Sequence, residues 1–441
     1  LIPHYLRVDL NNPIPIYNSI YQSILHLKNL LLYNKNFKTF NKDSYKSSIG
    51  LPFLTFISDR DHLFNILYPI FLRIGSENVF CIIKDKNVLK KFEVKPINYC
   101  LLSELPNVNY VEWKSEFSVL WRKIKNPIKN FISSTGVKKS YTLNIKNYLF
   151  IETRLIISYE RLLKFLKPPF ILTEHDRFKN ISSLISVGNV CSIKTYSMMH
   201  GVINDIQGYT PLIANKIFVW GNLQKAQLTS YGIREKKIVV TGATQLEKTI
   251  VGNKLLIKNK LGLRKESIVL VLSTNNIEKK NRHKLAQIFC EMINNLSNDK
   301  FYGLIKIHPS ESIKFYQPYL SNNVLIDKDN VLTQSDYFCL ADAVCNYNSA
   351  FFVESINREI PVFTINVKED KSNLTFQYCN KFKLPISNNS HDLSITISKY
   401  FNDIDFQDSL KNKIKKISSN FCISSGHEVV DKIIKLIEND I

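Results

Sequence analysis

The sequence has no apolar run of the ~20 residues that a membrane-spanning helix needs. Its most apolar stretch, residues 63–74, is interrupted by Asn65, Pro69 and Arg73. We therefore expect a cytoplasmic chain that does not cross a membrane, and contact with the inner face of a membrane is left open. The chain begins with Leu1 and not Met, so a removed leader is also left open.

Signatures of several cofactor-dependent chemistries are missing as well. There is no P-loop and no GxGxxG sequence, so ATP hydrolysis and hydride transfer lose their usual markers. No His and Cys residues have the spacing of a zinc site. The eight cysteines form no CxxC pair and lie mostly in apolar runs, which is typical of reduced core residues in a cytosolic protein.

Positive charge is what the chain has in excess. Lys and Arg number 59 against 38 Asp and Glu, a formal net charge of +21, which attracts polyanions, anionic lipid headgroups or phosphorylated substrates. The cations are spread along the chain and form no Arg-rich arm, so we do not expect nucleic acid as a partner. Part of the excess has a simpler origin, because abundant Lys, Asn and Ile are typical of an AT-rich genome.

The length of 441 residues predicts two domains. Short apolar runs alternate with helical patterns, which favours an α/β fold with two parallel, Rossmann-like sheets. We expect a helical extension at 1–48, Rossmann-like domains at 49–245 and 246–420, and a C-terminal helix at 421–441 that packs back across both. The predicted strands are 51–58, 78–84, 108–113, 170–173, 195–199, 216–220, 237–241, 267–272, 301–307, 323–326, 343–346 and 361–365.

Ligands of doubly wound sheets bind beyond the carboxyl ends of the strands, so polar residues at these places carry most weight. In the second domain, Lys306 and His308 precede Pro309 at the end of one predicted strand, where a cation and an imidazole suit a phosphate. The ordinary alternative is a structural turn in which the His side chain has no role in binding. A hydroxyl- and amide-rich loop after another strand also suits phosphate contact, and it comprises Ser273, Thr274 and Asn275.

In a third segment of the second domain, a predicted strand ends at Asn346 and a predicted helix begins after Asn348 and Ser349. Unpaired N–H groups and partial positive charge at a helix N-terminus favour phosphate, and a Ser hydroxyl completes such a cradle. Glu354, five residues beyond Ser349, is spaced to reach ribose hydroxyls. The alternatives are an ordinary Ser N-cap and a solvated helix charge.

Four acid-base side chains follow two successive predicted strands of the first domain. Glu174, His175 and Asp176 come after one strand, and His200 comes after the next. Transfer of a group to a hydroxyl needs a base that takes the proton of that hydroxyl, and a carboxylate or imidazole at a strand end can do so. A salt-bridged loop carboxylate is the alternative for each acid.

Short motifs occur in an order that resembles one enzyme class. They are Met199-His200-Gly201, Ile217-Phe218-Val219-Trp220-Gly221, Val240-Thr241-Gly242, Lys306-Ile307-His308-Pro309 and Asn348-Ser349-Ala350 with Glu354. Over roughly residues 51–370 they resemble the QHG, v-x-G, vtG, K-x-H-P and S-[ST]-x-x-x-E motifs of GT-B glycosyltransferases of bacterial surface polysaccharide synthesis. That group includes capsule Kdo transferases, polysialyltransferase-like enzymes and CDP-glycerol glycerophosphotransferases. Met199 replaces the usual Gln, and Ala350 replaces a second hydroxyl, which implies one fewer phosphate contact.

The resemblance implies a GT-B fold with the reaction in a cleft between the domains, the first binding the acceptor and the second the donor. It implies a CMP-activated donor, Kdo or a nonulosonic acid such as sialic acid, held through His308 and Ser349 with Gly242 nearby. By the same analogy Asp176 or Glu174 is the base. The implied acceptor is an anionic or lipid-linked glycan of the capsule or lipopolysaccharide kind.

No metal cofactor is expected. Asp59, Arg60 and Asp61 resemble the metal-binding Asp-x-Asp of another glycosyltransferase architecture, but they lie some 250 residues before the nucleotide motifs. Asp61 is also well placed to cap a helix that begins at His62.

Three other functions stay open at this stage. The nucleotide motifs also suit a CDP-glycerol or CDP-ribitol polyol-phosphate transferase. They suit a UDP-sugar glycosyltransferase, or an epimerase of the same fold. A polyanion-binding scaffold without activity is the alternative from outside the enzymes.

Overall fold

The computed structural model describes most of the chain beyond residue 52. The described residues are 53–57, 61–135, 141–176, 179–201, 203, 209–246, 250, 252–275, 277–296, 299–308, 310–328, 331–347, 349–368 and 374–440. The predicted helical extension at 1–48, together with Asp59, Arg60, Pro309 and Asn348, lies outside them.

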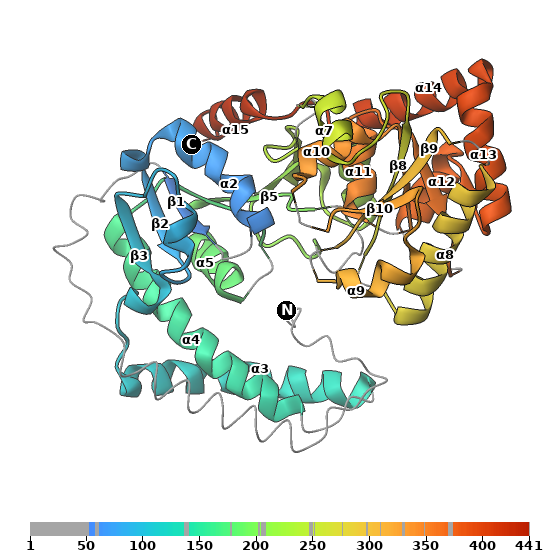
Figure 1. Cartoon of the computed structure of the whole chain (residues 1–441). Helices are drawn as coiled ribbons and strands as arrows, with labels where there is room; N and C mark the ends of the chain where they lie inside the picture. The colour runs from blue at the N-terminus through green and yellow to red at the C-terminus, as the bar shows by residue number, and fades with distance from the viewer. Residues whose placement is uncertain are drawn as a thin grey trace.

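The first domain is built on a seven-stranded parallel sheet in the order β3-β2-β1-β4-β5-β6-β7 (Figure 1). The central strands are largely apolar and buried on both faces, as parallel sheets covered by helices require. They are β1 (Phe53–Ile57), β2 (Val79–Ile83), β3 (Asn98–Leu101), β4 (Phe170–Thr173), β5 (Lys194–Met198), β6 (Lys216–Val219) and β7 (Ile238–Val240). The helices are α2 (Asp61–Ile74), α3 (Tyr110–Thr135), α4 (Tyr141–Leu166), α5 (Lys179–Val190) and α6 (Asn222–Ser230).

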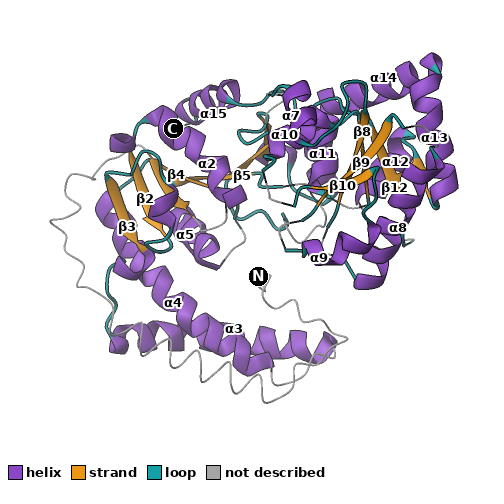
Figure 2. Ribbon diagram, in the orientation of Figure 1, coloured by secondary structure: helices purple, strands orange, loops and turns teal. Residues whose placement is uncertain are grey.

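The second domain is built on a six-stranded parallel sheet in the order β10-β9-β8-β11-β12-β13 (Figure 2). Its strands are β8 (Ile268–Ser273), β9 (Phe301–Lys306), β10 (Val324–Ile326), β11 (Ala343–Asn346), β12 (Val362–Ile365) and β13 (Ile386–Ser387). Its helices are α7 (Lys254–Lys260), α8 (Lys279–Asn295), α9 (Ile313–Tyr316), α10 (Gln334–Leu340), α11 (Ala350–Asn357), α12 (Leu374–Phe382) and α13 (Ser390–Asn402). Short 3-10 turns lie at Ser76–Asn78, Val88–Lys91, Leu102–Glu104, Glu235–Lys237 and Gln317–Tyr319. The predicted class, α/β with two Rossmann-like domains, is confirmed.

The C-terminal helices pack back from the second domain onto the first. Helix α14 (Ile404–Phe421) packs on α11 of the second domain and on α6 of the first. Helix α15 (His427–Glu438) then packs on α2, and its Val430 and Ile433 are buried in the core of the first domain. Just beyond α15, Asp440 accepts hydrogen bonds from Tyr196 Oη and Lys216 Nζ, both at 2.7 Å. The last described residues therefore lie on the first domain.

Two motif glycines lie where the returning chain crosses the end of the first sheet. A Cβ at Gly221 would lie 2.2 Å from Asn420 O, and one at Gly242 would lie 2.3 Å from Ser424 O. Gly242 also has a φ of +108°, which side chains rarely adopt. Ala243 N donates to Ser424 O at 3.1 Å and so fixes the crossing. The packing of the return segment is thus a structural reason for glycine at both positions.

The predicted strand at 108–113 is wrong, because α3 begins at Tyr110. Asn109 Oδ1 accepts a hydrogen bond from Glu112 N at 2.8 Å, which is the contact of a helix N-cap. Trp113, which looked like the end of a strand, stacks on Phe150 of α4 with ring centroids 4.0 Å apart. Strands β3 and β13, which were not predicted, are short edge strands with weak apolar patterns.

Candidate functional site

The ends of three strands of the second domain bring predicted site residues together. Strand β8 lies between β9 and β11, and Ser273 is in register with Lys306 on one side and with Asn346 on the other. Residues in register on parallel strands direct their side chains to the same face. Ser273 Oγ also lies 2.8 Å from Ser349 Oγ. Residues that are up to 76 positions apart in the chain therefore form one polar surface.

Ser349 caps α11 at this surface. Its hydroxyl accepts from Phe351 N at 3.3 Å, so the ordinary N-cap role is present in the structure. The same hydroxyl faces Ser273, and the N-terminus of α11 provides the partial positive charge that favours an anion. Ala350 begins the helix next to it. Ser349 can therefore cap the helix and also contribute its hydroxyl to a phosphate site.

Lys306 places a cation beside this helix start. Its Nζ lies 5.1 Å from the ring centroid of Phe351 and 5.6 Å from that of Tyr337. Burial lowers the pKa of Lys306, because an apolar wall disfavours its charge. The carboxylate of Glu354 acts on this pKa in the opposite direction. A cation held in this way is well suited to a phosphate.

Glu354 is not the solvated helix charge of the ordinary alternative. Its side chain is 21% exposed, and Gln334 Nε2 donates to Glu354 Oε2 at 2.7 Å. Arg358 Nη1 lies 3.6 Å from the same oxygen. Burial raises the pKa of Glu354 above its ordinary value. The carboxylate is therefore held in position on the second turn of α11.

Asn346 is a site residue to which the motifs gave little weight. Its side chain is fully buried at the end of β11, and among the described residues neither its amide oxygen nor its amide nitrogen has a hydrogen-bond partner. An unpaired buried polar group costs about 1–3 kcal/mol. Only its place at a strand end could have indicated it from the sequence.

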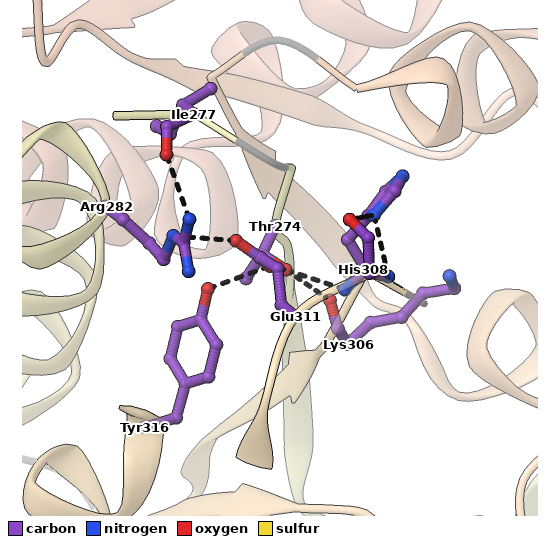
Figure 3. Close-up of polar contacts among 8 residues, drawn as sticks. Thr274, Ile277, Arg282, Lys306, His308, Glu311 and Tyr316 are labelled. Atoms are coloured by element: carbon purple, nitrogen blue, oxygen red, sulfur yellow. Dashed lines mark hydrogen bonds and ion pairs between the residues drawn. The ribbon is translucent and has the colours of Figure 1, made fainter. Parts of the chain in front are cut away.

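A buried carboxylate ties the loop after β8 to the loop after β9 (Figure 3). The Glu311 side chain has no exposed surface, and its Oε2 accepts hydrogen bonds from Thr274 Oγ1 and, at 3.0 Å, from Tyr316 Oη. Its Oε1 forms an ion pair with Arg282, whose Nε lies 2.9 Å away. The Nε–H bond of Arg282 does not point at this oxygen, so the contact is an ion pair and not a hydrogen bond. Thr274 Oγ1 in turn accepts from His308 N at 2.9 Å. The network holds the backbone at His308 in place.

The ring of His308 is oriented by the same loop. Ser310 N donates to His308 Nδ1 at 3.2 Å, and Ser310 Oγ lies 2.8 Å from the same nitrogen. Because the backbone N–H can only donate, Nδ1 is the acceptor and the proton of the neutral ring is on Nε2. His308 therefore offers an Nε2–H donor. The half-buried Asn275 follows Thr274 in the neighbouring loop.

Neither Glu311 nor Arg282 was predicted as a site residue. Glu311 is a single acid in a loop, and Arg282 lies on a helix among several Lys residues. No local pattern distinguishes them from solvated charges. Only the fold shows that both are buried against each other.

The acid-base residues of the first domain are also brought together, since β4 and β5 are neighbours. Glu174 is 0% exposed, and His175 and Asp176 are each 3% exposed, whereas His200 is half-buried. The rings of His175 and His200 lie edge to face with centroids 5.5 Å apart, and Tyr209 stacks on His200 at 5.2 Å. His200 is therefore the member of the cluster that a ligand reaches most easily.

Asp176 has a structural task in this cluster. Its Oδ2 accepts hydrogen bonds from Ile213 N at 2.6 Å and from Ala214 N at 3.2 Å. A carboxylate that accepts two backbone N–H groups fixes the loop before β6 and is less available as a proton acceptor. Gly242, at the end of β7, lies against the return segment described above.

No group of three or more His, Cys, Asp or Glu side chains in the described ranges is arranged to hold a metal ion. Within those ranges, no helix combines the length and the apolar character needed to span a bilayer.

The fold is similar to that of solved two-domain enzymes. MnaA from S. aureus in complex with UDP matches with a TM-score of 0.53 at 14% identity, over 88% of this chain and 96% of that one. A glycosyltransferase from Rickettsia africae matches with 0.53 at 14%, over 88% and 98%. A UDP-N-acetylglucosamine 2-epimerase, named as putative, from Listeria monocytogenes matches with 0.56 at 11%, over 89% and 96%.

No protein-family model matches the sequence, and no curated protein matches it. At these identities the similarity establishes the fold alone, which is GT-B-like. Enzymes named as glycosyltransferases and as epimerases share it to the same extent.

Proposed function

We propose that the chain is a glycosyltransferase that uses a UDP-activated sugar and binds the nucleotide at the ends of β8, β9 and β11. The observation that carries this proposal is the convergence of Lys306, Ser273 and Ser349 at the N-terminus of α11. Similar structures are described with UDP or UDP-N-acetylglucosamine bound, which supports a uridine nucleotide. The structures named here do not support CMP, Kdo or a nonulosonic acid, so the UDP-sugar alternative replaces the CMP-sugar prediction in this proposal.

In the proposed complex the diphosphate lies against the start of α11. The hydroxyls of Ser273 and Ser349 and the Nε2–H of His308 are donors that suit phosphate oxygens, and Lys306 balances their charge. The same groups stabilise UDP as a leaving group, because negative charge grows on the phosphate as the sugar leaves. The buried Asn346 amide is proposed to gain its missing partner in this complex.

The first domain supplies the base in this scheme. The hydroxyl oxygen of the acceptor bonds to the anomeric carbon of the sugar, the bond from that carbon to the phosphate oxygen breaks, and UDP leaves. The acceptor's proton passes to His200, which is half-buried, while His175 and Tyr209 pack on its ring. In this proposal Asp176 positions the neighbouring loop and takes no part in the proton transfer, which is supported by its contact with Ile213 N. The acceptor is a glycan, and its anionic or lipid-linked character is proposed from the charge of the chain.

Calorimetric titration of UDP tests the nucleotide site. Each of the single changes His308→Ala and Ser349→Ala is expected to weaken UDP binding about tenfold, because each removes one hydrogen bond to a charged oxygen, about 1.5 kcal/mol. Ser390→Ala and His391→Ala are the matched controls, since this pair lies at the start of α13 in the same domain and is not part of the site. Both controls are expected to bind UDP as the wild type does.

Two outcomes of these titrations would contradict the proposal. Tighter binding of CMP than of UDP would restore the CMP-sugar prediction. Binding of UDP that is unchanged in both site variants would place the nucleotide elsewhere.

Epimerisation of a UDP-sugar is the second candidate, because named 2-epimerases are as similar in fold as the named glycosyltransferase. The two reactions differ in their products. A transferase releases UDP in proportion to a glycosylated acceptor, whereas an epimerase changes the sugar without any acceptor.

A further inference from the structure

Helix α3 lies apart from both sheets. It packs on α4, and α4 packs on α5 of the first domain. In Figures 1 and 2, α3 and α4 project together from that domain. With 26 residues and a rise of 1.5 Å per residue, α3 is about 39 Å long. A helix of this length offers an extended contact surface, with Pro127 inside its C-terminal half.

One side of α3 is fixed to α4. Trp113 is buried and stacks on Phe150, and Phe117 meets the edge of the same ring with centroids 5.0 Å apart. Glu112 forms an ion pair with Arg161 of α4. These contacts determine which face of α3 is turned away from the protein.

Four exposed cations of α3 lie in one row, and a fifth exposed cation, Lys123, lies off it. Lys114, Arg122, Lys125 and Lys129 are all exposed. Together with Ser118 they are spaced by four, four, three and four residues, which places them on one side of a helix. Arg122 Nε donates to Ser118 O at 3.4 Å, in line with this arrangement.

The acids of α3 lie elsewhere on the helix. Glu112 is paired with Arg161, and Glu116, two residues after Lys114, lies about half a turn away from the cationic row. Apolar side chains accompany the row at the start of α3, where Tyr110 is 58% exposed and Val111 is 77% exposed. Exposed Tyr and aliphatic side chains beside Lys and Arg are typical of helices that lie on a membrane surface.

We propose that the row Lys114–Arg122–Lys125–Lys129 of α3 docks the protein on a membrane of anionic lipids. The positive row is complementary to anionic headgroups, and the exposed Tyr110 and Val111 suit the boundary between headgroups and acyl chains. A second copy of the chain does not suit this face, because two such rows repel each other. Docking by α3 holds the first domain, which is proposed to bind the acceptor, at the surface where a lipid-linked acceptor lies.

Vesicle flotation tests the docking surface. Wild-type protein is mixed with vesicles of phosphatidylcholine alone and of phosphatidylcholine with 30% phosphatidylglycerol. Binding is expected only to the second kind and is expected to fall with added salt. The variant with Lys114→Glu, Arg122→Glu, Lys125→Glu and Lys129→Glu is expected to bind at least a hundredfold more weakly, since each basic residue near an anionic surface contributes about a factor of five.

The matched control makes the same change in net charge on α8 and α14. It carries Lys280→Glu, Lys411→Glu, Lys415→Glu and Lys416→Glu, all at exposed positions. We expect it to bind anionic vesicles within about threefold of the wild type. Equal loss in both variants would overturn the proposal in favour of diffuse charge attraction.

Two further outcomes contradict the proposal. The first is that the wild type does not float with anionic vesicles. The second is that α3-dependent binding is seen to a soluble anionic polysaccharide and not to vesicles, which would make α3 a glycan-binding surface. UDP titration of the α3 variant separates this proposal from the proposed function, because UDP affinity is expected to stay at the wild-type value whether or not α3 binds lipid.

Discussion

Replacing His200 with Ala is expected to lower kcat for sugar transfer about a thousandfold, since a positioned general base contributes roughly 10²–10⁴ in rate. His200 is half-buried, whereas Glu174 and His175 are almost completely enclosed. The affinity for UDP is expected to stay within about twofold, because the nucleotide is proposed to bind in the other domain. The measurement is the rate of UDP release from the donor that the titrations support, with saturating acceptor.

Two further variants serve as controls for the effect of His200→Ala. His391→Ala, on the surface of the second domain, is expected to keep the wild-type rate. Asp176→Ala is expected to lower the free energy of unfolding, because the N–H groups of Ile213 and Ala214 lose their acceptor. A His200→Ala enzyme with a rate within fivefold of the wild type would show that another group removes the proton.

The change Arg282→Ala is expected to lower the free energy of unfolding by about 3–5 kcal/mol. It leaves the Glu311 carboxylate, which has no exposed surface, without the cation that balances its charge. Denaturation followed by circular dichroism measures the effect. The three tryptophans, Trp113, Trp121 and Trp220, all lie in the first domain, so their fluorescence reports whether that domain unfolds separately.

A second substitution separates lost charge balance from lost packing. The double change Arg282→Ala with Glu311→Gln is expected to be at least about 1 kcal/mol more stable than Arg282→Ala alone, because a neutral amide needs no counter-charge. Gln can still accept from Thr274 and Tyr316. Lys280→Ala, an exposed change on the same helix, is expected to stay within about 0.5 kcal/mol of the wild type. A double variant no more stable than the single one would contradict this explanation.

The sheets were readable from the sequence because their strands are buried on both faces. Runs such as Phe53–Ile57 and Ala343–Asn346 have few polar residues; the first is followed by Ser58, and the second ends at Asn346. The same rule misassigned 108–113, where Val108 and Trp113 are buried by α4 and not by a sheet. Periodicity over six residues cannot separate these two environments.

The candidate site was readable only in part. Lys306 and Ser349 follow strands, and strand ends are where such folds bind ligands. Glu311 and Arg282 gave no signal, since burial of an ion pair depends on two loops meeting in space. The roles of the acid-base residues of the first domain could not be predicted from the sequence either. The exposure of His200 and the backbone contacts of Asp176 depend on the fold and not on the neighbouring residues in the chain.

The most direct test of the account is a crystal structure of the protein with UDP. We predict the β-phosphate within hydrogen-bond distance of Ser349 Oγ at the start of α11, with Lys306 Nζ beside it and the Asn346 amide paired. A diphosphate bound at any other place, with Ser273 and Ser349 still bonded to each other as in the present structure, would contradict the proposed donor site.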